Sequence, residues 1–343
     1  MTLTMYVDTG RWRAHQRGLL AEFPGLVPVA KGNGYGFGNR RLAAEAARLG
    51  TPMLAVGTAD EAAEVAEDFP GDLLVLTPYR VGEEPRELPP ERVVRTVAHA
   101  EALAALPSGS RVVVECMTTM RRHGIAVADL ARLPVGEVRV EGFALHLPLD
   151  RPDGSDPVEE VTGWVRAIEA AGLPTGAVYL SHLAAKDVTR LAERHPRTVF
   201  RSRIGTRLWL GEVEALSSRA TVLDVTPVAR GERYGYRQHK APSDGHLLVV
   251  TGGTAHGVGL EAPKYVHGML PRAKGLARAG LATVNRTLSP YSWRGKQLWF
   301  AEPPHMQASI LFLPGELKPP AMGDELPLNV RHTTTHFDRV AER

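Results

Sequence analysis

The sequence predicts a (β/α)8 TIM-type barrel over residues 1–215, followed by a mainly antiparallel β domain over residues 216–343. Between residues 27 and 205, short apolar and β-branched segments alternate with segments of helical character. Strands that are apolar throughout their length are typical of a parallel sheet covered on both faces. After about residue 215 the helical segments stop, and short β-rich pieces separated by Gly, Pro and Asp begin. This change in sequence pattern indicates a second, antiparallel domain.

The predicted barrel strands follow one another in order. They are VPVA (27–30), MLAVG (53–57), LLVLT (73–77), VVRTV (93–97), RVVVEC (111–116), VRVEGFALH (138–146), AVYLSH (177–182) and TVFRSRIG (198–205). The segments between them, such as RRLAAEAARLG, carry Ala, Leu, Glu and Arg at helical spacing. Barrels of this kind begin near about 200 residues, so a closed barrel is favoured. An open, doubly wound parallel sheet is the alternative.

The expected strands of the second domain are shorter and are interrupted by turn residues. They lie in ATVLDVTPV (220–228), HLLVVTGG (246–253), KQLWFAEPP (296–304), SILFLPGE (309–316) and ELPLNVRHTTTHF (325–337). Pieces of this length and composition are typical of antiparallel sheets.

Composition narrows the function classes. The chain has 343 residues, of which 43% are apolar and 23% charged, with a formal net charge of +3. These values are ordinary for a globular protein, and the arginines are mixed with acids, so neither nucleic acid nor a membrane is an expected partner. Cys116 is the only cysteine, and no apolar run has signal-peptide or bilayer length, so we expect a cytoplasmic protein. No spacing of His, Cys and acids predicts a metal site.

Polar side chains follow the ends of the predicted barrel strands, where barrel enzymes carry their chemistry. They are Lys31, Glu115, Cys116, His146, Ser181, His182 and Arg203, the last followed by Gly205 and Thr206. Ser181 and the Gly205–Thr206 pair follow the seventh and eighth strands, where many barrels bind a phosphate. Alternatively, Ser181 and Thr206 cap the helices that follow them.

The stretch VPVAKGNGYGFG places Lys31 directly after the first strand. A lysine that is partly desolvated near other cations has a lowered ammonium pKa and can react with an aldehyde. The alternative is a lysine whose stem packs over the rim while its charged head stays in water. The four glycines of the loop let a ligand approach the backbone, and Tyr35 can offer a hydroxyl to a phosphate or carboxylate. The loop lacks the glycine spacing of a P-loop or a dinucleotide fingerprint.

These motifs resemble those of the alanine racemase family of fold type III pyridoxal-phosphate enzymes. VPVAKGNGYGFG is similar to the family's VxKANAYGHG, RIGTRLWLG to RxGIxxYG, and MRRHG to MGRLG. The resemblance implies that pyridoxal 5'-phosphate binds covalently to Lys31. It also implies that Tyr35, Ser181, Gly205 and Thr206 bind the cofactor phosphate, that Arg203 faces the pyridine nitrogen, and that His146 supports Arg203.

The same resemblance assigns the substrate-handling groups. Arg122 would lie near the cofactor's phenolic oxygen and the substrate carboxylate. Tyr236, in GERYGYRQ, would be a second catalytic base supplied by the partner subunit of a homodimer, with Tyr234 as a competing candidate. His336 takes the place of a C-terminal phosphate-binding tyrosine. Lys31 and Tyr236 would then remove and return the Cα proton of an amino acid, as in a racemase.

Arg203 adds a physical argument for this reaction. A guanidinium cannot accept the pyridine proton, so the ring of the cofactor stays unprotonated and is a poorer electron sink than one facing a carboxylate. A short-lived carbanion suits brief removal and return of a proton.

Several positions depart from the family pattern. Glu115 stands where a carbamylated lysine often lies, and either group offers an anion to orient Arg122. GTAHG replaces GYADG, with Thr254 and His256 at the changed positions, and PHMQ replaces CMDQ, with His305 at the methionine position. These segments shape the substrate mouth in the relatives. With Arg122, we therefore expect Thr254 and His305 to contact a substrate other than, or broader than, alanine, either larger or more acidic.

Two other functions fit the same cofactor. One is a lyase that performs retro-aldol cleavage or β-elimination on a D-amino acid, for which relatives typically add a metal. The other is a non-catalytic cofactor-binding or regulatory protein.

Overall fold

The computed structural model describes residues 2–83, 91–152, 154–260 and 287–343. The chain divides into two compact units. One comprises Arg13–Gly211, and the other combines Met1–Trp12 with Glu212–Arg343. None of the described helices is both long and apolar enough to cross a membrane.

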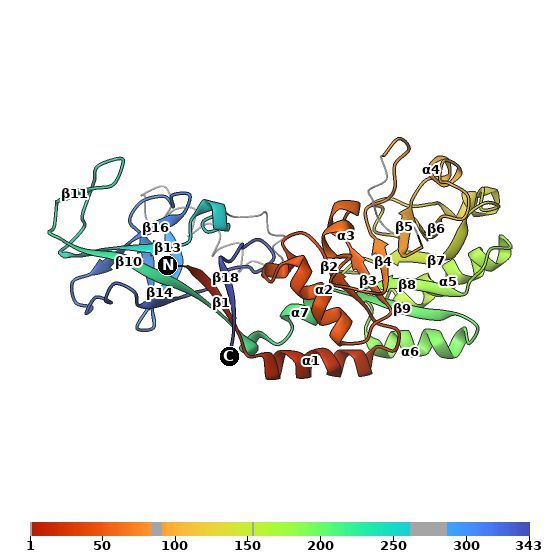
Figure 1. The fold of residues 1–343 in the computed structure, drawn as a ribbon, viewed down its shortest axis with the longest axis horizontal. Helices are drawn as coiled ribbons and strands as arrows, with labels where there is room; N and C mark the ends of the chain where they lie inside the picture. Colours follow the sequence, from red (N-terminus) through yellow and green to blue (C-terminus); the bar gives the residue numbers. More distant parts are fainter. Residues whose placement is uncertain (1, 84–90, 153, 261–286) are drawn as a thin grey trace. The chain divides into compact units, whose positions relative to one another are not determined.

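The Arg13–Gly211 unit is the predicted barrel (Figure 1). Its parallel strands are β2 (Val27–Ala30), β3 (Met53–Val56), β4 (Asp72–Val75), β5 (Val93–Val97), β6 (Arg111–Glu115), β7 (Arg139–His146), β8 (Ala177–Ser181) and β9 (Val199–Ile204). Every predicted strand is present, with ends shifted by at most two residues. β2 pairs with β9, Val27 opposite Arg203, so the ring of strands closes. The barrel prediction is confirmed, and the open-sheet alternative is wrong.

Helices surround these strands (Figure 1). They are α1 (Thr9–Glu22), α2 (Asn39–Arg48), α3 (Ala59–Val65), α4 (Ala100–Ala104), α5 (Pro157–Ala170), α6 (Ala185–Arg194) and α7 (Thr206–Leu210), with short 3-10 turns η1 (Gly34–Gly36) and η2 (Val127–Arg132). Local sequence explains where several begin. Thr58 and Glu61 form a reciprocal capping box at the start of α3. Asp156 accepts the Val158 N–H just before Pro157 opens α5.

The barrel interior is filled by side chains that alternate along the strands. One buried apolar cluster contains Val27, Val29, Met53, Ala55, Leu74, Val94, Val113, Ala144, Ala177 and Tyr179. Side chains two residues apart in a strand share a face, so the next inward positions after Val29, Val113, Ala144 and Tyr179 belong to polar residues. These are Lys31, Glu115, His146 and Ser181. Because side chains alternate along each strand, these four polar residues all lie at the C-terminal mouth of the barrel.

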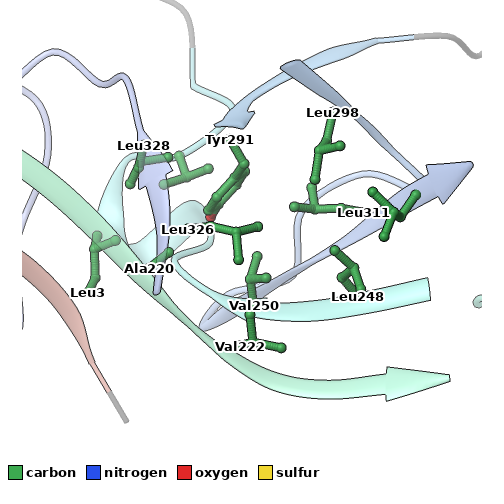
Figure 2. Packing of buried hydrophobic residues seen from close by; sticks show 12 residues of the cluster. Leu3, Ala220, Val222, Leu248, Val250, Tyr291, Leu298, Leu311, Leu326 and Leu328 are labelled. Carbon is green, nitrogen blue, oxygen red and sulfur yellow. The ribbon is translucent and has the colours of Figure 1, made fainter. Parts of the chain in front are cut away.

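The second unit is the predicted antiparallel domain. Its strands are β1 (Leu3–Val7), β10 (Leu216–Val228), β13 (Gly245–Thr251), β14 (Leu288–Trp293), β15 (Lys296–Phe300), β16 (Ala308–Pro314), β17 (Glu325–Leu328) and β18 (Arg339–Glu342), with a hairpin of β11 (Arg233–Tyr234) and β12 (His239–Lys240) and the 3-10 turns η3 (Val213–Ala215) and η4 (Thr254–His256). The sheet order is β13-β16-β15-β14-β17-β10-β1-β18, and β13 also pairs with β10. Leucines, valines and Tyr291 from several of these strands pack into one core (Figure 2).

The first residues differ from the predicted domain division. The predicted barrel spans residues 1–215, but β1 belongs to the antiparallel unit. It pairs antiparallel with β10, Leu3 opposite Ala220, and parallel with β18, Thr4 opposite Arg339. Leu3, Met5 and Val7 are fully buried. An apolar five-residue strand at this position therefore completes the second domain, and the later boundary falls at Glu212 rather than at residue 216.

Candidate active site

A buried ion pair lies at the C-terminal mouth of the barrel. Arg203 Nη1 lies 3.4 Å from Glu115 Oε2, and both side chains are almost fully buried. Arg122 Nη2 lies 4.0 Å from the other carboxylate oxygen, so Glu115 is placed between two guanidinium groups. Burial raises the pKa of Glu115 and lowers that of Arg203, while the opposite charges oppose both shifts. The Nε and Nη2 atoms of Arg203 are buried without a hydrogen-bond partner in the described part of the chain.

Two histidines stand beside this pair. The ring of His146 meets the ring of His182 edge to face, with centroids 5.1 Å apart. Burial, followed by repulsion from Arg122, Arg203, His182 and Lys31, lowers the pKa of His146 to about 3. The pKa of His182 is lowered as well, mainly by burial. Both rings are therefore neutral near pH 7. The structure places His146 near Arg203, but the described hydrogen bond of Arg203 goes to Glu115.

Lys31 directly follows β2 and lies near the charges of Arg122 and Arg203. Lys31 is exposed as a residue, but partial desolvation of its ammonium group, then the charges of Arg122 and Arg203, lower the pKa of Lys31, and Glu61 opposes this shift. The Glu61 carboxylate accepts the backbone N–H of Gly32 at 2.7 Å and that of Gly57 at 2.7 Å. It therefore ties the loop after Lys31 to the start of α3. Sequence reasoning missed Glu61, although its capping-box spacing from Thr58 is readable in the sequence.

Tyr35 and Gly205 meet across the mouth. Tyr35 is buried and has a left-handed backbone, with φ +54, within η1. Its hydroxyl lies so close to Gly205 that a Cβ at that position would collide with it. Burial, aided by Glu61, raises the pKa of Tyr35 to about 12. Tyr35 is therefore a neutral hydroxyl donor, and a side chain at position 205 would displace its ring.

Ser181 and Thr206 do not cap the helices that follow them. The N-cap of α6 is Ala184, and that of α7 is Gly205, with no side-chain capping bond at either. The capping alternative is therefore wrong. Ser181 is buried at the end of β8, where it lies opposite His146 in the strand register.

Hydrogen bonds to β7 and α5 hold the loop that carries Arg122. Thr118 Oγ1 donates to the carbonyl of His146 at 2.6 Å. Glu160, in the first turn of α5, accepts from the backbone N–H of Thr119 at 3.0 Å and from its hydroxyl at 2.9 Å, and pairs with Arg151 at 2.8 Å. An open hollow of about 480 Å³ is lined by Met117, Thr118, Thr119 and Arg121. No sequence motif marked Glu160.

The β unit brings together three other predicted site residues. The Tyr236 ring lies 4.8 Å from the His305 ring, centroid to centroid. The Thr254 backbone N–H donates to the His305 carbonyl at 2.8 Å. Tyr236 is 86% exposed, whereas the competing Tyr234 is partly buried, and burial raises its pKa. Tyr236 is therefore the more accessible of the two tyrosines.

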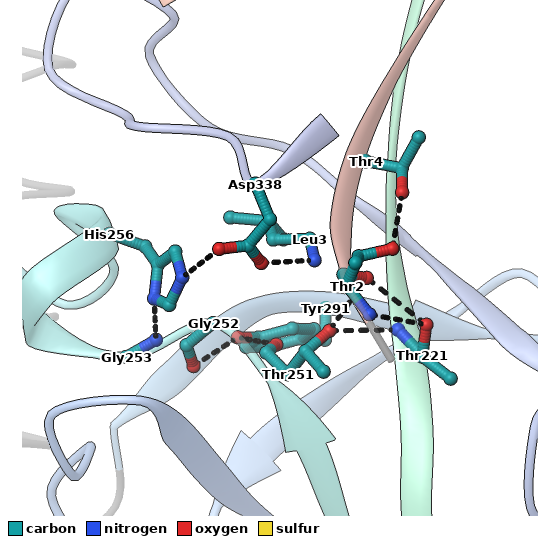
Figure 3. Close-up of polar contacts among 10 residues, drawn as sticks. All are labelled: Thr2, Leu3, Thr4, Thr221, Thr251, Gly252, Gly253, His256, Tyr291 and Asp338. Carbon is teal, nitrogen blue, oxygen red and sulfur yellow. Dashed lines mark hydrogen bonds and ion pairs between the residues drawn. The ribbon is translucent and has the colours of Figure 1, made fainter. Parts of the chain in front are cut away.

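His256 and His336 lie elsewhere in this unit. His256 Nε2 lies 3.1 Å from Asp338 Oδ1, and Asp338 Oδ2 accepts the Leu3 backbone N–H at 2.7 Å (Figure 3). Asp338 thus ties His256 to β1. The exposed His336 donates its backbone N–H to the His256 carbonyl at 3.2 Å. In the described ranges no group of three or more His, Cys, Asp or Glu is arranged to hold a metal ion.

One protein family and several solved structures are similar to this chain. The family model described as "Alanine racemase, N-terminal domain" matches residues 7–185. A search of curated proteins found no match. Similar solved structures include the biosynthetic alanine racemase of Pseudomonas aeruginosa, with 20% identity, a TM-score of 0.68 and coverage of 100% of this chain and 99% of that chain. The E. faecalis alanine racemase has 19% identity, a TM-score of 0.69 and coverage of 99% and 98%.

A further similar structure is the alanine racemase of Bartonella henselae with covalently bound pyridoxal phosphate. It has 17% identity and a TM-score of 0.69, and the alignment covers 97% of this chain and 91% of that chain. At these identities the likeness concerns the fold of the whole chain.

Proposed function

The chain belongs to the family of the alanine racemase N-terminal domain, whose model covers residues 7–185, and we propose that it is a pyridoxal-phosphate-dependent amino-acid racemase. The observation that carries this proposal is the set of cations at the barrel mouth. Lys31, with a lowered pKa, shares the mouth with Arg122 and with the buried Arg203. A lysine in such surroundings is suited to react with an aldehyde near neutral pH.

The residues present fit the proposed cofactor. The Nε and Nη2 atoms of Arg203 are buried donors without a hydrogen-bond partner in the described residues. The pyridine nitrogen of the cofactor would be a suitable acceptor for one of them. The Tyr35 hydroxyl packed on Gly205 forms a cradle that any side chain at that position would fill. Ser181 and Thr206 add hydroxyl groups for a phosphate, and we propose His336 as a further phosphate ligand. The cations of the mouth outnumber Glu115, so an anionic ligand is favoured.

When bound, pyridoxal phosphate supplies a conjugated ring that stabilises the negative charge left on Cα. Lys31 would hold the Cα proton on one face of the substrate, and Tyr236 on the other. Arg122, oriented by Glu115, would bind the substrate carboxylate. Arg203 cannot accept a proton, so it would limit the lifetime of that charge and favour return of the proton. The neutral His146 would add no further positive charge beside Arg203.

We propose that Tyr236 acts in the barrel of a second copy, so that the enzyme is a homodimer. Its support is the exposure of the Tyr236 ring and of a neighbouring apolar residue. Tyr236 is 86% exposed, and Met306, which follows the contacting His305 in the chain, is 71% exposed. Large exposed apolar side chains around a functional tyrosine favour burial against another protein surface.

The substrate would be larger or more acidic than alanine. Thr254 is smaller than the family's tyrosine, and His305 adds a ring nitrogen, Nδ1, that is able to accept a hydrogen bond from a side chain of the substrate. The open hollow beside the Arg122 loop is compatible with added substrate volume.

The test is deuterium incorporation at Cα in heavy water, followed by NMR and chiral chromatography, with pyridoxal phosphate and the L and D forms of a panel of amino acids. Exchange with inversion is expected, and Lys31→Ala should abolish it. Metal-dependent cleavage of a D-amino acid would favour the lyase. No turnover of any panel member, together with tight cofactor binding, would favour the non-catalytic alternative.

A further inference from the structure

Glu302 connects Tyr236 and His305. Its side chain is only 3% exposed, and both of its oxygens accept hydrogen bonds. Oε2 accepts the backbone N–H of Tyr236 at 2.9 Å, and Oε1 lies 2.6 Å from His305 Nε2. Gly235, with φ +71, leaves room for this carboxylate, because a Cβ there would collide with it.

We propose that Glu302 and His305 are positioning residues that hold the Tyr236 ring in place for proton transfer. The inference rests on the proposed function, in which Tyr236 is the second base. Neither Glu302 nor its link to Tyr236 follows from the family motifs, because the contact joins the β11–β12 loop to a turn 66 residues away.

The hairpin that carries Tyr236 needs such an anchor. β11 and β12 are two residues each and pair Arg233 with Lys240 and Tyr234 with His239, and beyond them Ala241 forms backbone hydrogen bonds with Gly231 and Glu232. A hairpin this short is marginal by itself, and a ring that is 86% exposed has few contacts to fix its rotamer. The bond from the Tyr236 backbone to a buried carboxylate therefore adds an anchor between the two short strands. A charge-assisted hydrogen bond of this kind is stronger than one between neutral groups.

Both the backbone and the side chain of His305 are held by hydrogen bonds. Its carbonyl accepts the Thr254 N–H at 2.8 Å, and its own N–H donates to Ala308 at 2.9 Å. Because Glu302 accepts from Nε2, a neutral His305 carries its proton there and presents Nδ1 as an acceptor. The imidazole then packs against the Tyr236 ring in one orientation. A chain of contacts thus runs from η4 through His305 and Glu302 to the catalytic tyrosine.

The test compares Glu302→Gln with Tyr236→Phe. The amide keeps the shape of the carboxylate but has one acceptor oxygen and one donor, so either Tyr236 N–H or His305 Nε2–H loses its partner. Cα deuterium exchange would be measured separately from the L and D forms of alanine, serine, glutamate and lysine. Tyr236→Phe should abolish exchange from one enantiomer. Glu302→Gln should slow that same enantiomer by about tenfold to a hundredfold and leave the other within about twofold.

Glu316→Gln is the matched control, because Glu316 is an exposed carboxylate of the same unit, paired with Lys296. It should leave both enantiomers unchanged. A second readout needs no activity: ¹⁵N NMR of His305 should show the proton on Nε2 in the wild type and a changed tautomer balance in Glu302→Gln.

The outcomes separate the two proposals. Wild-type exchange with equal losses for both enantiomers in Glu302→Gln, or with no loss, would overturn the positioning role alone. A wild-type His305 protonated on Nδ1 would also overturn it. Absence of any wild-type exchange would overturn the proposed racemase and this inference together.

Discussion

Arg203 and Glu115 form a buried ion pair, with Nη1 and Oε2 3.4 Å apart, on two barrel strands that are not adjacent. Glu115→Gln should destabilise the protein by about 3 kcal/mol, because Arg203 would keep a buried charge without its counter-ion. Urea unfolding at pH 7 measures this. The double variant Glu115→Gln/Arg203→Met should recover part of the loss. A loss below about 1 kcal/mol would mean that Glu115 is already protonated in the folded protein.

His146 should make the stability of the protein depend on pH. Its pKa falls from 6.5 to about 3 on folding, so between these values the unfolded chain binds a proton that the folded protein excludes. Stability from this group is therefore complete above about pH 6.5 and is lost as the pH falls. Urea unfolding of the cofactor-free protein at pH 4 to 7 should show a shallower slope for His146→Gln than for the wild type. Equal slopes would show that His146 titrates normally.

Glu160 should control the Arg122 loop. Glu160→Ala removes the bonds to Thr119, so amide hydrogen exchange across residues 117–122 should become faster, and KM should rise by about tenfold with a smaller change in kcat. Glu159→Ala is the control, because Glu159 is an exposed neighbour in the same helix and pairs with Arg194. Equal effects of the two variants would contradict this role.

Tyr35 and Gly205 should govern cofactor affinity. Tyr35→Phe removes one hydroxyl donor and should weaken pyridoxal phosphate binding by about tenfold, which is about 1.4 kcal/mol. Gly205→Ala should weaken it more, because the added Cβ displaces the Tyr35 hydroxyl. Fluorescence titration with the cofactor measures both. Gly163→Ala, whose Cβ would meet open space, should bind as the wild type does. An unchanged affinity of Gly205→Ala for pyridoxal phosphate would show that the cofactor phosphate binds elsewhere.

The barrel was predictable because its strands are apolar on both faces. Since side chains alternate along a strand, the polar residues after these strands, Lys31, Glu115, His146 and Ser181, could be expected at one mouth of the barrel. β1 was not predicted, because a stretch as short as LTMYV does not indicate which sheet it joins, and its partners β10 and β18 lie more than 200 residues away. The carboxylates Glu160 and Glu302 were missed for a related reason. Each looks like an ordinary surface acid in sequence, and its role arises from partners 41 and 66 residues away.

Lys31 offers the most direct test of the central claim, that the barrel mouth binds an aldehyde cofactor. The protein would be incubated with pyridoxal phosphate at pH 7.5, reduced with borohydride, digested and mapped by mass spectrometry. We predict one stoichiometric phosphopyridoxyl group on Lys31 and none in Lys31→Ala. Equal labelling of the wild type and Lys31→Ala, or a label on another lysine, would contradict the account.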